Sequence, residues 1–315
     1  MNLKNFQHAK VFGFIIFFIS LNFFTCTRIF EPLEITVIQK NKYQIIHLSE
    51  EKDPYGFETI ASLSTNYPKD ENGVRLFSIQ GKLCYYPVNL SQFILWYIDC
   101  YNKTQNTEYL SRSELFANKI IDLSVSYNDA CYLPYDFDIN PHGNKSILLK
   151  APWFSGMAQG QALSVFVRLY NITRNKKYLD FAHKLFYSFK NYKKDNLIWT
   201  VFIDADNYYW IEEYPDIEPG RVLNGFIFGI YGLYDYYFLT KDPVCKYYLE
   251  AAITTIQKYI GEFRNPGNVS FYCLRHEHTD ANYHQIHIDQ LKTLYYMTGE
   301  SYFLNVADEF YNDYH

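Results

Sequence analysis

The sequence predicts an all-α protein, an (α/α)4 toroid of four helix hairpins that follows a short N-terminal arm with candidate β-strands. Three observations predict this fold class. A local pattern recurs four times after about residue 82, an apolar segment precedes each copy, and the copies are far enough apart to hold two helices and a loop. Self-similarity at such a long period indicates repeated supersecondary units.

The recurring pattern is an aromatic residue with a threonine three positions later, a short polar turn, an aromatic–leucine pair and then a small residue. The threonine and the polar turn stop one helix and start the next. The leucine and the small residue, three positions apart, begin the packed face of the second helix. The four threonines are Thr104, Thr173, Thr240 and Thr298.

The segments before the four copies are largely apolar all round, which indicates buried helices. They cover residues 93–96, 162–167, 226–230 and 291–296. The threonines recur after 69, 67 and 58 residues, so each unit holds a buried inner helix, a turn, an outer helix and a long return loop. Four such units close most simply into a ring of inner helices inside a ring of outer helices. An open solenoid is the alternative, and because it would expose an end that needs a cap, we favour the ring.

Residues 1–27 have the pattern of an export signal or a membrane anchor. Lys4 and Lys10 precede an uncharged run of 17 residues from Val11 to Thr27. A basic flank before an apolar stretch is typical of both, and this length is at the short limit for crossing a bilayer. Cys26 adds the alternative of a bacterial lipoprotein signal. Each of these alternatives predicts that the rest of the chain acts outside the cytoplasm, in a lumen, a periplasm or at the cell surface.

Residues 28–81 do not fit the repeat, and we interpret them as an arm or a small β-layer. Residues 34–38 and 73–77 look like short strands. The predicted domains are therefore the signal or anchor at 1–27, the arm at 28–81 and the toroid at 82–315.

The charge and composition exclude some classes of function. The net charge is −5, and no basic stretch is long enough to indicate nucleic-acid binding. Aromatic residues make up 20% of the chain. Tyrosine on a concave surface suits sugar binding, but an AT-rich genome gives the same excess, and we favour this second explanation. The six cysteines form no C-x-x-C pair, which argues against a zinc site, and their spacing gives no disulfide pairing.

The return loops before the second, third and fourth inner helices lead to the same end of the toroid, because all inner helices point the same way. We expect the functional site there. In the first loop, Trp153 either stacks on a sugar or anchors the core beside Pro152. In the second, Glu212 and Glu213 stand among aromatic residues, so we expect one carboxylate to be desolvated, with a raised pKa that suits proton transfer.

The third loop and the helix after it are rich in histidine, with His276, His284 and His287. No two of these are four positions apart, and no obvious carboxylate ligand stands beside them. We therefore predict no metal at this site.

Five strings in these loops resemble the C-terminal domain of the D-glucuronyl C5-epimerases, the enzymes that modify heparan sulfate and heparosan. They occur in family order across about residues 82–315. The strings are Ala-Pro-Trp-Phe-Ser-Gly-Met-Ala-Gln-Gly-Gln from Ala151, Glu-Glu-Tyr-Pro from Glu212, Val-Leu-Asn-Gly-Phe from Val222, Tyr-x-Leu-Arg-His from Tyr272 and Tyr-His-x-x-His-Ile from Tyr283. The α/α toroid of that family agrees with the fold that the repeat predicts independently.

The resemblance implies which residues act in the site. The catalytic residues that it implies are Glu213, Tyr214, Tyr272 and Tyr283. The uronate-binding residues that it implies are Asn224 and Arg275, and from the same strings we add Trp153, Gln159, Gln161 and His276 as candidate substrate-binding residues. Two positions depart from the family pattern: Cys273 stands where an acidic residue is common, and Phe154 where tyrosine is common.

C5 epimerisation removes the proton next to a carboxylate and returns a proton to the opposite face of the sugar. We expect Glu213 and Tyr283 to be the two proton carriers, and Arg275 to hold the carboxylate and the charge of the enolate-like intermediate. Tyrosine acts as a base only if a neighbouring cation lowers its pKa from about 10, and we expect the other tyrosines to assist by hydrogen bonding. The reaction requires no cofactor.

The predicted function is thus inversion of D-glucuronate to L-iduronate within a heparosan-like polysaccharide. A polysaccharide lyase or glycoside hydrolase on a similar toroid is one alternative, and a surface glycan-binding protein without turnover is another. The predicted partner is an acidic polysaccharide and not a nucleic acid, with membrane attachment through the N-terminal segment and a homodimer left open.

Overall fold

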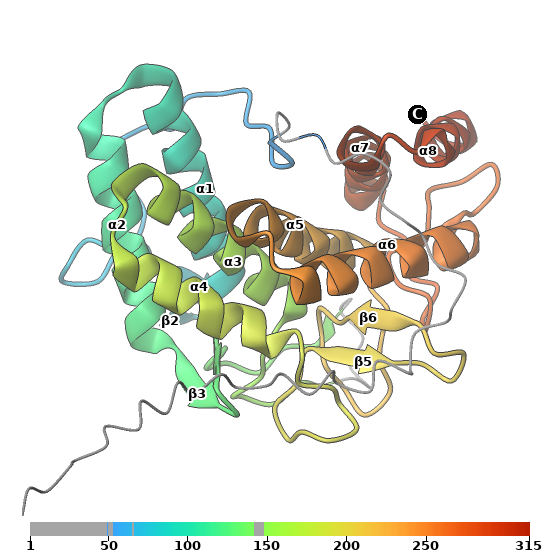
Figure 1. Cartoon of the computed structure of the whole chain (residues 1–315), viewed down its shortest axis with the longest axis horizontal. Coiled ribbons are helices and arrows are strands. Elements are labelled where there is room, and N and C mark those ends of the chain that lie inside the picture. The colour runs from blue at the N-terminus through green and yellow to red at the C-terminus, as the bar shows by residue number, and fades with distance from the viewer. Residues whose placement is uncertain (1–48, 50–52, 65, 142–147) are drawn as a thin grey trace, which may run out of the picture. The chain divides into compact units, whose positions relative to one another are not determined.

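The structure is a computed structural model that describes residues 49, 53–64, 66–141 and 148–315. Within these residues eight helices follow one another as four hairpins (Figure 1). The hairpins are α1 (Pro87–Thr104) with α2 (Thr107–Leu123), α3 (Gly156–Thr173) with α4 (Lys176–Ser188), α5 (Leu223–Thr240) with α6 (Pro243–Phe263), and α7 (Ala281–Thr298) with α8 (Ser301–Asp313). The predicted all-α fold, an (α/α)4 toroid of helix hairpins, is confirmed.

Each inner helix ends at the threonine of the repeat. The Thr104 hydroxyl donates to the carbonyl of Cys100 at 2.7 Å and accepts from the N–H of Asn106 at 3.2 Å, and the other three threonines bond in the same way. The residue after each threonine has a left-handed backbone, and its N–H donates to the carbonyl of the aromatic residue of the repeat. The repeated sequence pattern therefore encodes the hydrogen bonds that end one helix and lead into the next.

The inner helices α1, α3, α5 and α7 pack against one another in chain order. The helices α3 and α5 approach most closely at glycines: a Cβ atom on Gly160 would lie 2.5 Å from the Cα of Gly229. Only glycine permits such a small separation between the two helices. Apolar side chains of the inner and outer helices form one continuous core.

In the described part of the chain, three short antiparallel hairpins accompany the helices. They are β1 (Phe77–Ile79) with β2 (Lys82–Cys84), β3 (Val125–Tyr127) with β4 (Ala130–Tyr132), and β5 (Val201–Ile203) with β6 (Tyr209–Ile211). The strands β3, β5 and β6 lie below the helices in Figure 1, where the return loops gather. The strand expected at 73–77 overlaps β1 at Phe77, while the one expected at 34–38 lies outside the described residues.

The N-terminal segment from Asp53 to Ala61 lies against the inner helices. The Tyr55 hydroxyl bonds to the Ser164 hydroxyl on α3 at 2.9 Å, and the indole N–H of Trp96 on α1 donates to the carbonyl of Thr59 at 2.7 Å. The segment therefore belongs to the same compact unit as the helices.

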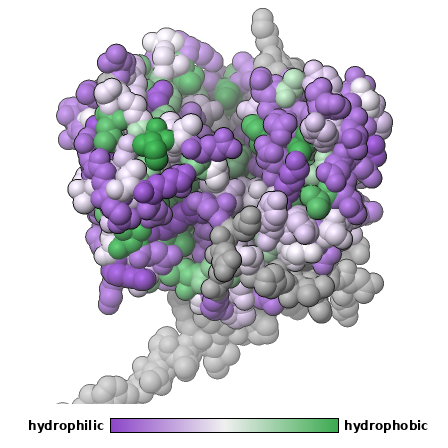
Figure 2. Space-filling view, turned by 90° about the horizontal axis from the view of Figure 1, so that it is seen from above, coloured by the Kyte–Doolittle hydropathy of each residue, from purple (hydrophilic) through white to green (hydrophobic). Residues whose placement is uncertain are grey.

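Five cysteines of the described residues are buried free thiols: Cys84, Cys100, Cys131, Cys245 and Cys273. None of the helices described is both long and apolar enough to cross a membrane, and the predicted signal or anchor at 1–27 lies outside the described residues. The face in Figure 2 is mostly hydrophilic, with hydrophobic residues in separate patches.

Candidate active site

The return loops converge at the N-terminal ends of the inner helices, where they enclose a pocket of about 480 Å³. The first turns of all four inner helices contribute to it. The lining residues are Tyr86, Val88, Asn89, Gln92, Tyr135, Trp153, Ser155, Met157, Glu213, Tyr214, Asn224, Phe228, Asn282, Tyr283 and Ile286. The pocket thus lies at the end of the toroid that the direction of the inner helices predicts.

Glu213 is the carboxylate of this pocket. It follows β6, and its side chain is buried. Glu213 lies very close to Gly225, because a Cβ atom placed on Gly225 would be only 2.7 Å from the Cβ atom of Glu213. The pKa of Glu213 is raised to about 8, chiefly by burial and also by the nearby Glu212, although hydrogen bonds from Tyr214 and Tyr272 act in the opposite direction. Near neutral pH the carboxyl group is therefore mostly protonated in the free protein.

Glu212 differs from its neighbour in position. It is fully buried, burial raises its pKa to about 7, and its two oxygens accept from the backbone N–H groups of Arg221 and Tyr214, at 2.8 and 3.3 Å. Both adjacent carboxyl groups are thus desolvated, but Glu212 holds the loop that follows, whereas Glu213 lines the pocket.

Three tyrosines surround Glu213. The Tyr272 hydroxyl donates to Glu213 Oε2 at 3.3 Å, and the ring of Tyr272 contacts that of Tyr283 at 4.5 Å between centroids. Burial, and then the charge of Glu213, raise the pKa of Tyr214, Tyr272 and Tyr283 above the usual value. The three hydroxyl groups therefore stay protonated in the free protein and can donate hydrogen bonds.

The expected cation beside Tyr283 is not found. No lysine or arginine is among the described residues that line the pocket, so the pKa of Tyr283 is raised and not lowered. The expectation that a cation makes Tyr283 a base is therefore wrong for the free protein, because burial and the nearby carboxylate both favour the protonated phenol.

Asn224 and Trp153 also reach the pocket. Asn224 is in the first turn of α5, and its buried side-chain oxygen has no hydrogen-bond partner among the described residues. The indole of Trp153 stacks on Tyr135 at 3.8 Å between centroids and donates to the carbonyl of Phe137 at 2.8 Å. One face of Trp153 is therefore covered, so the residue anchors the core as well as lining the pocket.

Four predicted binding residues are outside the pocket lining, and two of them, Gln159 and Arg275, are bound to other protein groups. Gln159 is buried in protein contacts: it accepts from Leu133 N and donates to Cys131 O and the Ser188 hydroxyl. Arg275 forms ion pairs with Asp216 at 3.3 Å and Glu218 at 2.8 Å, and it is not among the pocket-lining residues. These two residues are not available to a ligand as predicted, because protein groups already satisfy their polar side chains.

His276 and Gln161 are likewise outside the pocket lining. His276 Nδ1 lies 3.4 Å from the Cys273 sulfur, in the loop that carries Arg275. Gln161 is fully buried on α3 and lines a second cavity that adjoins the pocket.

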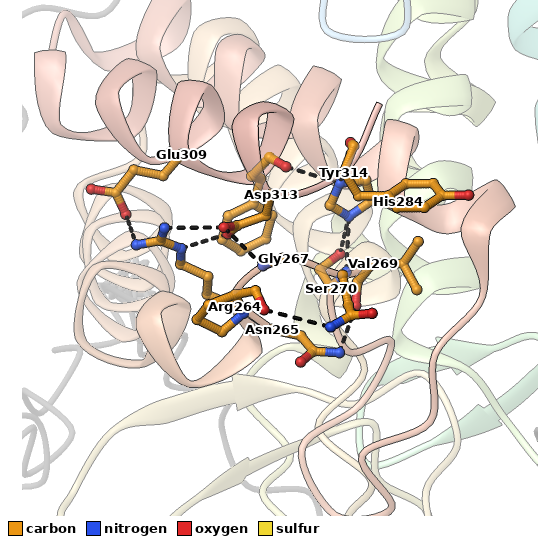
Figure 3. A network of polar contacts seen from close by, with 12 residues as sticks. Arg264, Asn265, Gly267, Val269, Ser270, His284, Glu309, Asp313 and Tyr314 are labelled. Carbon is orange, nitrogen blue, oxygen red and sulfur yellow. Dashed lines mark hydrogen bonds and ion pairs between the residues drawn. The ribbon is translucent and has the colours of Figure 1, made fainter.

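The two other histidines join the third loop to the last hairpin, and Figure 3 shows the contacts of His284. His284 Nδ1 accepts from Ser270 N at 2.9 Å, and its Nε2 lies 3.0 Å from the carbonyls of Phe310 and Tyr314. His287 Nδ1 bonds to the Ser270 hydroxyl at 2.8 Å. These bonds fix the segment before Tyr272 to the helix that carries Tyr283. No cluster of His, Cys, Asp or Glu suited to a metal occurs within the described part of the chain.

The sequence reasoning missed the pocket residues of the first hairpin. Tyr86, Asn89 and Gln92 line the pocket from the start of α1, and burial together with Glu213 raises the pKa of Tyr86 to about 12. The position of α1 in the repeat could have indicated these residues, because the first turn of every inner helix lies at the end of the toroid that holds the pocket.

The fold and pocket define a class: a toroid of helix hairpins with proton-carrying side chains at one end of its inner helices. The family model described as "D-glucuronyl C5-epimerase C-terminus" matches residues 128–312. The chain belongs to this family.

Two curated relatives match parts of the chain. A D-glucuronyl C5-epimerase of Caenorhabditis elegans is 36% identical over 91 residues, which are 29% of this chain and 14% of that protein. An uncharacterized protein of Methanocaldococcus jannaschii is 26% identical over 157 residues, which are 50% of this chain and 51% of that protein. The chain thus spans about half of one relative and a smaller part of the other.

Solved structures share the fold at low identity. A cellobiose 2-epimerase from Bacillus thermoamylovorans B4167 is 12% identical, with a TM-score of 0.53 over 73% of this chain and 59% of that chain. A D-mannose isomerase is also 12% identical, with a TM-score of 0.51 over 75% of this chain and 61% of that chain. At this identity the likeness concerns the fold alone.

Proposed function

We propose that this chain inverts C5 of D-glucuronate residues in an acidic polysaccharide, heparosan or a related chain. The observation that carries the proposal is that Glu213 and Tyr283 line one pocket while Tyr272 contacts both. Membership of the C5-epimerase family supports the same reaction. Two proton carriers in one pocket are the minimum that an inversion by proton transfer requires.

In the proposed first step the ionised carboxylate of Glu213 takes the C5 proton, and the electron pair moves into the sugar carboxylate to give an enolate-like dianion. In the second step the Tyr283 hydroxyl gives its proton to C5 from the opposite face and becomes a phenolate. The inverted sugar has then lost one proton and gained one, while Glu213 holds an extra proton and Tyr283 lacks one.

A proton must then pass from Glu213 to Tyr283 to restore the site. Tyr272 supports such a transfer, because its hydroxyl is hydrogen-bonded to Glu213 and its hydrogen bonding also acts on the pKa of Tyr283. We assign Tyr272 the role of relay, and Tyr214 that of a second hydrogen-bond partner of Glu213.

Neutral donors of the pocket would hold the sugar carboxylate. The side chains of Asn89, Asn282 and Tyr86 line the pocket and carry N–H or O–H groups. Donors fixed in a buried site stabilise developing negative charge well. The carboxylate grip predicted for Arg275 would require it to leave Asp216 and Glu218, and it stays a prediction.

Hydrolysis fits the pocket less well than epimerisation. Glycoside hydrolases use two carboxyl groups about 5 to 9.5 Å apart. Among the described residues that line the pocket, Glu213 is the single carboxylate. A lyase shares the first step with an epimerase, so these two functions differ in the product and not in the first base.

The decisive experiment is incubation with heparosan and with N-sulfated heparosan in D2O. We expect deuterium at C5 together with L-iduronate in the product. An unsaturated, ultraviolet-absorbing chain end would instead identify a lyase, and polymer binding without deuterium uptake would identify a glycan-binding protein. Action on such a polysaccharide outside the cytoplasm would agree with the export pattern of residues 1–27.

A further inference from the structure

The face of α7 that carries Tyr283 continues with two buried polar side chains, His287 and Gln290. The three residues are four and then three positions apart, which places them on one side of the helix. His287 is fully buried and Gln290 is 3% exposed, and neither lines the pocket. We call His287 and Gln290 the polar stripe of α7.

Gln290 joins α7 to the start of α5. Its side-chain N–H donates to the backbone carbonyl of Asn224 at 3.0 Å. Asn224 lies in the first turn of α5 and lines the pocket, and the next residue, Gly225, lies directly against Glu213. This hydrogen bond therefore connects the helix that carries Tyr283 to the turn against which Glu213 packs.

His287 joins α7 to the segment that leads to Tyr272. Its Nδ1 bonds to the hydroxyl of Ser270 at 2.8 Å, two residues before Tyr272, whose ring contacts that of Tyr283 at 4.5 Å between centroids. Burial, and then the nearby His284, lower the pKa of His287 to about 3. The ring is therefore neutral near pH 7, and the stripe adds no charge beside the pocket.

The polar stripe is a costly way to pack two helices. Gln290 Oε1, His287 Nε2 and the side-chain oxygen of Asn224 are buried and have no hydrogen-bond partner among the described residues. A buried polar atom without a partner costs as much stability as a neutral hydrogen bond provides, or more. An apolar side chain of the same size would fill the space of Gln290 without this cost. Stability alone therefore does not account for a carboxamide at this position.

We propose that Gln290, assisted by His287, is a positioning residue that sets where Tyr283 stands relative to Glu213. This role rests on the proposed function, and it extends the site to residues that contact no substrate. Inversion requires the two proton carriers on opposite faces of one sugar ring. A shift of about 1 Å between α7 and α5 would therefore impair proton delivery far more than sugar binding.

The test compares Gln290→Met with Gln285→Met in the whole chain. Methionine has nearly the shape of glutamine but no N–H donor. Gln285 is the matched control, because it is exposed on α7 and bonds to Asp289 of the same helix. Each variant is incubated with heparosan in D2O, and deuterium at C5 and L-iduronate are measured separately.

We expect Gln290→Met to lower the rate of inversion about tenfold or more, with KM within about twofold of wild type. Exchange of the C5 proton of glucuronate should fall less, because Glu213 can still take this proton while Tyr283 is misplaced. The ratio of exchange to inversion should therefore rise, whereas Gln285→Met should keep the wild-type ratio. A wild-type ratio in Gln290→Met would overturn the proposal.

Thermal unfolding separates positioning from a purely structural role. Gln290→Met removes an unpaired buried oxygen, so we expect its Tm to stay equal or rise. A lower Tm with an unchanged ratio would show a structural role alone and would overturn the proposal. The second half of the stripe gives an independent pair: His287→Leu should raise the ratio, and His287→Asn, which can still bond to Ser270, should recover most of the wild-type value.

A measurement without turnover distinguishes this proposal from the proposed function. A wild-type chain that never exchanges C5 would overturn the epimerase. The carboxyl ¹³C resonance of Glu213, assigned by its loss in Glu213→Gln, then reports the position of α7. We expect its titration midpoint to rise in Gln290→Met, as the hydrogen bond from Tyr272 weakens, and to stay unchanged in Gln285→Met. The same midpoint in both variants would overturn the positioning role.

Discussion

The hydroxyl of Tyr272 donates a hydrogen bond to Oε2 of Glu213 across 3.3 Å. The two residues are 59 positions apart, on the loops before α7 and α5 respectively. The contact therefore exists only when the third and fourth hairpins are packed, so that formation of the pocket depends on the complete fold of this half of the toroid.

The relay role of Tyr272 predicts a specific loss of turnover. Tyr272→Phe keeps the ring that contacts Tyr283 and removes the hydroxyl that joins it to Glu213. We expect kcat to fall about 10- to 100-fold while KM changes little, because the lost group acts on proton return. Steady-state kinetics on heparosan measure both constants, and an unchanged kcat would exclude the relay.

The two proposed carriers predict a different pattern. Glu213→Gln and Tyr283→Phe should each abolish inversion while polymer binding is retained, since both changes preserve shape and remove a proton carrier. Each single variant should still exchange the C5 proton of one epimer through its surviving carrier. Deuterium uptake without inversion, followed by NMR, is the measurement; near wild-type inversion in either variant would show that the carriers are misassigned.

Activity should depend on pH through Glu213. Burial raises its pKa to about 8 in the free protein, and abstraction of the C5 proton requires the ionised form. We therefore expect kcat/KM for glucuronate to rise as the pH increases toward about 8 and then to level off. A profile that is flat between pH 6 and 9 would argue that Glu213 is not the base.

Stability should depend on pH through the same group. The carboxyl pKa of Glu213 is higher in the folded protein than in the unfolded chain, so the folded state binds more protons between about pH 4.5 and 8. The stabilisation that the proton provides is complete at pH 4 and is lost as pH rises through 8. Glu213→Gln should accordingly gain Tm relative to wild type at pH 9, with little gain at pH 4.

The sequence was informative where one local chemistry repeats. Each threonine of the repeat lies at the end of an inner helix, where its hydroxyl donates to the backbone carbonyl four residues earlier. That local rule, with the direction of the helices, was enough to predict four hairpins and the end of the toroid that holds the pocket. Glu213, Tyr214 and Tyr283, which line the pocket, were named from the strings that resemble the C5-epimerase family.

The remaining features depend on packing between distant segments. The ion pairs of Arg275 with Asp216 and Glu218 join two loops whose distance no motif encodes. Gln159 and Gln161 look alike in the sequence, yet Gln159 bonds to protein groups while Gln161 lines the second cavity that adjoins the pocket. The contribution of α1 was missed because its first turn contains no recognisable motif.

The contact between Gly225 and Glu213 gives a prediction with a built-in control. A Cβ atom on Gly225 would lie 2.7 Å from Glu213 Cβ and 2.8 Å from its Cδ, which is too close for any rotamer that keeps the carboxyl group in place. Gly225→Ala should therefore displace Glu213 and lower kcat by at least tenfold. Gly261, on α6, has open space at the same position, and Gly261→Ala should keep full activity and stabilise the protein by about 1 kcal/mol through helix propensity. If both alanine variants had wild-type kcat and folded normally in circular dichroism, the position of the Glu213 carboxyl group would not govern turnover.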